Sequence, residues 1–301
     1  MAMPALDPGP VELHARNVVF DWSETPLHWI PNEPTASNAI SVVNMLFPEA
    51  ERWFIEAYNE ALPFVQDDEL AATMRGFIGQ EAMHAEAHDH AIAEFLEANG
   101  IETKAFLAQM EWLFRKLLGP KKAGSAKAKR KQLVERLWLI AAAEHYTAIL
   151  GNFALNNTWE EHGADPAMMD ILRWHGAEEV EHRCVAHDVA VYFGDGYLRR
   201  ARAMAVILVG LLAVVFRGAA FIGAQDPHYR GAHALLILPR YMKAAHKGLL
   251  PSLRSVLFAT ITYFKPSFSP VEVGSTAQAV AYLAKSPAAR RAGHAPRALE
   301  D

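Results

Sequence analysis

The sequence predicts an all-α fold, and three observations support this prediction. Apolar residues recur at helical spacing over several long stretches, no strand-like alternation of useful length occurs, and Pro or Gly separates the stretches. The chain has 301 residues, which is enough for one large helical domain with extensions. We therefore expect a sizeable helical core.

Composition narrows the class of protein. Charged residues make up 21% of the chain and the formal net charge is −5, so the global basic field that non-specific nucleic-acid binding needs is missing, and we expect no nucleic-acid partner. The single cysteine, Cys184, excludes an internal disulfide framework and suits a reducing compartment. The first residues, "MAMPALDPGPVELHARN", lack the basic start and apolar run of a signal peptide. The expected location is the cytoplasm.

The helical pattern divides the chain into three parts. Residues 1–38 are expected to form an irregular N-terminal extension, residues 39–264 an all-α domain, and residues 265–301 a C-terminal tail. Within the domain, we expect a core at 41–193 and additional helices at 197–264. The core should contain four long helices and one extra helix over 101–119; the four are expected at 41–62, 67–98, 132–155 and 166–193.

One apolar stretch bears on solubility. The segment "AMAVILVGLLAVVF" at 203–216 has fourteen uncharged residues between Arg202 and Arg217, whereas a membrane-spanning helix needs about 20. A longer span would place Arg217 in the bilayer, which is costly. We expect a buried core helix, with contact to a membrane surface as the main alternative.

Ionisable residues lie on the apolar faces of the four long helices. Each helix carries one glutamate in an apolar stripe: Glu51, Glu81, Glu144 and Glu179. Two of these glutamates begin a Glu-x-x-His pair, which His84 and His182 complete. Residues three apart on a helix point toward the same side, so each pair can converge on one point.

Four buried carboxylates require a compensating charge, because an isolated buried ion neutralises rather than stay charged. Two divalent cations would supply it. One Glu from each of two helices with Glu-x-x-His from each of the other two is the dinuclear carboxylate arrangement of ferritin-like bundles. The separations of 30, 63 and 35 residues between successive glutamates fit two helical hairpins joined by one long crossover. We therefore predict a ferritin-like four-helix bundle with a dinuclear metal site, plus extra helices; a coincidental polar network is the alternative.

Neighbouring residues on the same helices are assigned by their direction. His175 precedes Glu179 by four residues on the same stripe and is expected to be a third histidine ligand. His88 lies one turn beyond His84 and is expected beside the site rather than on the metal. Glu178 lies about 100° around the helix from Glu179, where it can orient a ligating histidine.

These residues also carry a family resemblance. The segments "VVFDWSETPLHWIPNEPTASNAIS", "FPEAERWF", "FIGQEAMHAEAH", "AAAEHYTA", "WHGAEEVEHRCVAHDV" and "YFKPSFSP" resemble the bacterial family described as predicted metal-dependent hydrolases, which is ferritin-like. The pattern of His175, Glu179 and His182 is also similar to that of di-iron N-oxygenases that oxidise aryl amines. Their substrate does not carry over, because the similarity stops at these ligands.

The expected function is that of a dinuclear metal enzyme. Iron is the favoured metal, with manganese and zinc as alternatives, since imidazole and carboxylate ligands suit all three. We favour oxidation of an organic substrate by dioxygen in an apolar cavity, with Phe54, Tyr58, Phe77 and Trp174 as candidate walls. Hydrolysis by a metal-activated water is the first alternative, and metal storage or a scaffold role is the second. The expected partners are a lipid-like or aromatic small molecule, dioxygen for the oxidative reaction, and a second copy of the chain in a homodimer.

Overall fold

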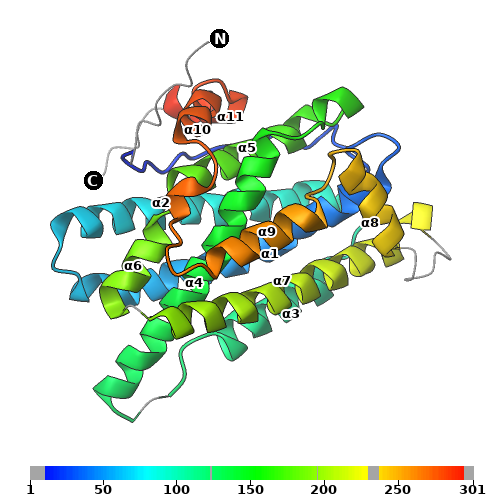
Figure 1. Ribbon diagram of the computed structural model, residues 1–301. Helices are drawn as coiled ribbons and strands as arrows, with labels where there is room; N and C mark the ends of the chain where they lie inside the picture. The colour runs from blue at the N-terminus through cyan, green and yellow to red at the C-terminus, as the bar shows by residue number, and fades with distance from the viewer. Residues whose placement is uncertain (1–10, 123, 195, 230–236, 295–301) are drawn as a thin grey trace.

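The computed structural model describes residues 11–122, 124–194, 196–229 and 237–294, and every regular element within these ranges is a helix (Figure 1). The prediction of an all-α fold is confirmed. The α-helices are α1 (Pro34–Ala61), α2 (Asp68–Ala91), α3 (Lys104–Glu111), α4 (Ala126–Leu155), α5 (Pro166–Glu181), α6 (Val185–Gly194), α7 (Tyr197–Gln225), α8 (Ile237–His246), α9 (Leu253–Tyr263), α10 (Thr276–Leu283) and α11 (Pro287–His294).

Four long helices form the centre of the molecule. Helix α1 packs along α2, helix α4 packs along α5, and the two pairs contact each other through α1 with α4 and α2 with α5. The chain passes from the first pair to the second through α3, which lies against α1. This connectivity fits the ferritin-like bundle expected from the spacing of the glutamates.

Local sequence signals explain where the bundle helices begin. The side chains of Asp67, Ser125 and Asp165 each accept a hydrogen bond from the backbone N–H three residues later, so they cap α2, α4 and α5. Helix α1 instead begins at Pro34, earlier than the expected residue 41, because a proline in the first turn loses no helical hydrogen bond.

The helices α4 and α5 approach each other closely at two glycines. A Cβ atom on Gly151 would lie 2.3 Å from the carbonyl oxygen of Gly176, and one on Gly176 would lie 2.6 Å from the Cα of Gly151. A larger residue at either position would push the backbones apart. These glycines therefore set the distance between the helices that carry Glu144 and Glu179.

The single helix expected over 166–193 is broken. Helix α5 ends at Glu181, His182 leaves the helical conformation with φ −101° and ψ 12°, and α6 begins at Val185. The guanidinium of Arg183 donates to the carbonyl of Val180 and to the hydroxyl of Thr276. These bonds satisfy the C-terminal end of α5 and favour its termination.

The expected C-terminal tail contains two helices. Both α10 and α11 pack against α5, at the top of the view in Figure 1. The buried carboxylate of Asp170 accepts hydrogen bonds from the side chains of Tyr282 and Ser286 and from the backbone N–H of Ala288. Ser275 caps α10, so the Pro- and Ser-containing sequence marks helix starts here.

The prediction of a buried core helix at 203–216 is wrong. This segment lies in α7, which packs against α1 and α4 along one edge of the bundle (Figure 1). Helix α7 is long and apolar enough to cross a membrane by length and composition, yet only 11% of its most apolar window is buried. The bundle core is already filled by α1, α2, α4 and α5, so α7 buries one stripe that includes Met204, Gly218 and Ile222.

Candidate metal centre

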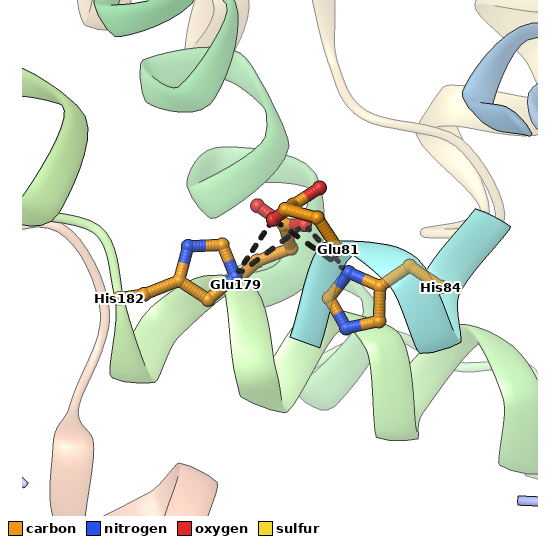
Figure 2. Close-up of side chains that lie close together, drawn as sticks. All are labelled: Glu81, His84, Glu179 and His182. Atoms are coloured by element: carbon orange, nitrogen blue, oxygen red, sulfur yellow. Dashed lines mark ion pairs between the residues drawn. The ribbon is translucent and has the colours of Figure 1, made fainter. Parts of the chain in front are cut away.

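Four of the predicted ligands converge in the centre of the bundle. Glu81 and His84 lie one turn apart on α2, Glu179 lies near the end of α5, and His182 follows that end, as Figure 2 shows. Glu81 Oε1 is 3.4 Å from His182 Nε2 and 3.8 Å from His84 Nδ1. Glu179 Oε1 is 3.6 Å from His84 Nδ1 and 3.8 Å from His182 Nε2. One donor atom from each residue therefore surrounds a common point.

A second group of donors adjoins the first. Glu51, His88 and His175 each offer one atom within 4.8 Å of the others, and all three side chains are buried. His175 joins the groups, because its Nε2 lies 2.8 Å from Glu179 Oε1 and 3.8 Å from Glu51 Oε1. The rings of His84 and His175 also stack with centroids 4.1 Å apart. Both ring nitrogens of His88 are held by hydrogen bonds to Asn44 and His175, so this group offers Glu51 and His175 as ligands for a second metal.

Glu144 reaches the site from α4. Its Oε2 lies 3.1 Å from His182 Nδ1, on the opposite side of that ring from Glu81. Its Oε1 is 3.4 Å from the Thr147 hydroxyl. All seven predicted ligand residues are therefore neighbours, although Glu144 lies outside both groups of converging donors.

The donor atoms fit a bound cation because many lack any other partner. Within the described part of the chain, buried atoms with no hydrogen-bond partner include both oxygens of Glu51 and of Glu81, His84 Nδ1, Glu179 Oε2 and His182 Nε2, whereas Glu144 Oε2 and His182 Nδ1 face each other as an ion pair. An unsatisfied buried polar atom costs about 1–3 kcal/mol. Lone pairs concentrated in this way are satisfied when they coordinate metal.

The electrostatics indicate the same need for positive charge. Burial raises the pKa of Glu51 well above its ordinary value, and repulsion from the carboxylate of Glu81 is the second largest cause. Burial and Glu144 raise the pKa of Glu81 to about 7, and burial and Glu179 raise that of Glu144 well above its ordinary value. Burial also opposes ionisation of Glu179, but His182 and His175 outweigh it and lower its pKa to about 2. Three of the four carboxylates therefore resist ionisation until cations are present.

Glu178 supports the site without joining it. Its Oε2 accepts a hydrogen bond from His84 Nε2 at 2.9 Å, which leaves His84 Nδ1 directed at Glu81 and Glu179. Its Oε1 accepts hydrogen bonds from Arg16 at 2.6 Å and from the Trp174 indole at 3.0 Å. This arrangement fixes the tautomer and orientation of the His84 ring.

A second chain of hydrogen bonds orients His175. His88 Nδ1 lies 2.8 Å from Asn44 Oδ1, and His88 Nε2 lies 2.7 Å from His175 Nδ1. With the amide oxygen of Asn44 as acceptor, each ring donates from Nδ1, so His175 presents the lone pair of Nε2 to the site. The placement of His88 beside the site agrees with its position one turn beyond His84.

Sequence reasoning missed two contributors to these networks. Arg16 comes from the irregular N-terminal segment, and Asn44 lies on α1 a full two turns before Glu51. Neither residue belongs to a spacing motif with the ligands it supports. Only the apolar face shared by Asn44 and Glu51, seven residues apart, could have hinted at Asn44.

An apolar cavity of about 450 Å³ reaches the site. Its inner end is lined by His175 and Glu179, and Phe47 packs there against the His175 ring with centroids 4.7 Å apart. Apolar side chains from the bundle and from the outer helices line the rest, among them Ile149, Phe153, Leu172, Leu211, Val215 and Val256. The expected walls are wrong: Phe54, Tyr58, Phe77 and Trp174 are buried in the core and do not line this cavity.

Comparison with known proteins identifies the family of this chain. Neither a search of curated proteins nor a search of solved structures gives a match to this chain. The model of one family, described as predicted metal-dependent hydrolase, matches residues 14–274. That range includes every residue of the two donor groups together with Arg16, Glu144 and Glu178. Because the match covers most of the chain, the chain belongs to the family of predicted metal-dependent hydrolases.

Proposed function

We propose that this chain is a dinuclear metal enzyme that oxidises an apolar organic substrate with dioxygen. The proposed ligands are Glu51, Glu81, His84, Glu144, His175, Glu179 and His182, and the proposed metal is iron. Two bound ferrous ions would supply two of the four electrons that dioxygen takes up, the substrate would supply the other two, and an external reductant would return the irons to the ferrous state. The unpaired buried donors support the metal assignment, and mixed imidazole and carboxylate ligands suit iron.

One observation carries the choice of oxidation: the cavity that ends at His175 and Glu179 is lined mainly by apolar side chains. Such a cavity binds an apolar molecule through burial of its surface and excludes bulk water. Oxidation of an apolar substrate needs no polar group in the cavity wall to hold a scissile bond. Hydrolysis consumes water and requires that a polar bond be held at the site.

The chain's own residues would organise this reaction. Phe47 would confine the substrate beside His175, and the Asn44–His88 pair would keep the His175 ring in place. Glu178 would hold His84 in one tautomer. The Thr147 hydroxyl lines the cavity and donates to the carbonyl of Glu144 at 3.0 Å, so its oxygen would accept one hydrogen bond from the substrate.

Hydrolysis is the second candidate, and the family description favours it. The same metal pair would lower the pKa of a bound water and polarise a carbonyl or phosphoryl oxygen. A hydrolase would take its metal as a Lewis acid, so zinc would serve as well as iron.

Anaerobic loading with ferrous iron, followed by a pulse of oxygen, tests the proposal. We expect two irons per chain, oxygen uptake and an optical change. The variant Glu179→Gln, which keeps the size of the side chain but removes its charge, should lose at least one iron and the oxygen uptake. A protein that stays colourless with iron, prefers zinc and cleaves chromogenic esters would support hydrolysis instead.

A further inference from the structure

Three outer helices expose apolar side chains around the mouth of the cavity. We call this surface the α7–α9 face and define it by Val209, Leu212 and Phe216 on α7, Met242 on α8, and Leu257 and Phe258 on α9. Val209 and Phe258 are each 68% exposed and Leu257 is 59% exposed. Exposed apolar side chains gathered on neighbouring helices mark an interaction surface.

The cavity opens on this face. Leu212, Phe216 and Leu253 line the cavity and are also about 40% exposed, at 40%, 41% and 39%, so they form its outer rim. Val209 lies one turn before Leu212 on the same stripe of α7, and Leu257 lies one turn after Leu253 on α9. The exposed apolar surface therefore continues directly into the apolar wall of the cavity.

Helix α7 is attached to the bundle along its length. A Cβ atom on Gly218 would lie 2.5 Å from Val42 Cγ1, so the backbone of α7 rests directly on α1. Arg202 pairs with Glu135 on α4 near one end of the apolar segment, and Arg217 donates to Gln109 on α3 at 2.6 Å near the other. A helix held on one side and exposed on the other can lie in a membrane interface but does not cross it.

The basic residues near the α7–α9 face indicate which partner it binds. Residues 197–265 contain ten Lys or Arg and one acidic residue, Asp226, which gives a formal charge of +9; because the whole chain carries −5, the other residues carry −14. Arg199 and Arg202 pair with Glu135 and Lys247 pairs with Glu33, so these three add little to the charge of the face. Asp226 is fully buried, whereas Lys243, Arg254 and Lys265 are exposed. A second copy of the chain would set this basic surface against itself. Anionic lipid headgroups attract such a surface.

We propose that the α7–α9 face docks on the surface of an anionic phospholipid bilayer and turns the mouth of the cavity toward the lipid. Leu257 and Phe258 enter the boundary between headgroups and acyl chains, and Lys243 and Arg254 contact the headgroups. An apolar substrate then enters the cavity from the bilayer without crossing water. The docking is independent of the proposed oxidation. Only the delivery of substrate from the bilayer rests on the proposed function.

Flotation of the metal-loaded full chain with vesicles tests the docking. The probes are vesicles of phosphatidylcholine alone and of equimolar phosphatidylcholine and phosphatidylglycerol. We expect binding to the anionic vesicles that weakens with added salt. The double variant Leu257→Ser/Phe258→Ser should bind them at least about tenfold more weakly, and Lys243→Gln/Arg254→Gln should lose roughly fivefold for each charge removed.

The matched control is Val19→Ser/Phe64→Ser, which changes two residues of similar exposure, 70% and 61%, on other elements. This control should bind as the unchanged chain does. The docking is wrong if the chain ignores anionic vesicles, or if the control loses as much binding as Leu257→Ser/Phe258→Ser. It is also wrong if Leu257→Ser/Phe258→Ser converts a dimer to a monomer and leaves vesicle binding unchanged, since the face would then bind a second copy.

The two proposals fail separately in this design. Iron content and oxygen uptake are measured on the same samples, and neither Leu257 nor Phe258 lines the cavity or contacts a proposed ligand. Vesicle binding without oxygen uptake would overturn the oxidation and support the docking. Oxygen uptake without vesicle binding would overturn the docking and leave the oxidation standing.

Discussion

Glu178 and Glu179 are adjacent and both buried, but their carboxylates face different partners. Glu178 contacts His84 Nε2 and Arg16, whereas Glu179 points at His175 and at His84 Nδ1. We expect Glu179→Gln to lose at least one metal. Glu178→Gln should keep both, with affinity weakened about tenfold to a hundredfold because an orienting partner is altered. Elemental analysis and competition with a chelator measure the two effects.

The opposite pattern, with Glu178→Gln empty and Glu179→Gln fully loaded, would show that the ligand register of α5 is wrong. The sequence predicted which of Glu178 and Glu179 is the ligand, because the helical period places only one of them on the stripe of His175 and His182. It could not indicate Arg16, which lies 162 residues before Glu178 in the sequence. Contacts over such separations depend on how the elements pack.

At the scale of the element, the Gly151–Gly176 contact sets the distance between α4 and α5. Gly176→Ala should destabilise the protein by about 2 kcal/mol or more, because a methyl group would meet backbone atoms that cannot move aside independently. It should also weaken metal binding, since the change displaces Glu179 from Glu144. Gly210→Ala is the control: a Cβ there has nothing within 4 Å, and alanine favours helix by about 0.5–1 kcal/mol. Urea unfolding of both variants measures the difference, and equal stability would contradict the role of the contact.

The C-terminal end of α7 is held by Asp226. Its carboxylate accepts hydrogen bonds from Asn38 on α1 at 2.7 Å, from His28 at 2.8 Å and from the backbone N–H of His228 at 2.9 Å. Burial would raise the pKa of Asp226, but these hydrogen bonds outweigh it and lower the pKa below its usual value. The ionised form therefore stabilises the fold.

Asp226→Asn should cost about 2–4 kcal/mol of unfolding free energy near neutral pH, since bonds to a charged acceptor are lost or weakened. A lowered pKa gives stability that is complete above the unfolded value of 3.8 and disappears as the pH falls through the folded value. The difference between the two proteins should therefore shrink at acid pH. Urea unfolding across this range measures it, and a pH-independent difference would exclude the ionised carboxylate as its source.

The sequence predicted the helices correctly where an apolar face determines the helix. It failed where tertiary contacts determine where a helix ends or how deeply it is buried. The four bundle helices have clear stripes, and three of them have side-chain caps, so their existence and order followed from the sequence. The end of α5 depends on Arg183 reaching Thr276, 93 residues away. Hydropathy alone placed 203–216 in the core, because it cannot tell a helix that fills a core from one that covers it.

At the scale of the whole molecule, acidic and basic residues lie in different parts of the chain. The acidic bundle holds the donor groups, and the basic outer helices carry the exposed apolar face and the mouth of the cavity. The outer helices complete the cavity, so they connect the metal centre to whatever covers the α7–α9 face.

Removing metal should change the stability of the whole molecule in a way that depends on pH. In the metal-free protein, burial and neighbouring carboxylates raise the pKa values of Glu51, Glu81 and Glu144, with that of Glu81 at about 7. A raised pKa gives stability that is complete below the unfolded value and is lost as the pH rises through the folded value. Below the unfolded histidine value of 6.5, the lowered pKa values of His88 and His175 act in the opposite direction. The melting temperature of the chelated protein should therefore fall as the pH rises from about 6.5 to above 7.

Metal binding has the opposite dependence, because ligands must be deprotonated before they coordinate. Metal at about a thousand times its dissociation constant should stabilise the fold by about 4 kcal/mol, or roughly 5–10 °C in melting temperature. The difference in melting temperature between loaded and chelated protein should accordingly widen as the pH rises. Calorimetry at several pH values measures it. A difference that stays constant or narrows with rising pH would mean that the buried carboxylates are not the groups that the metal neutralises.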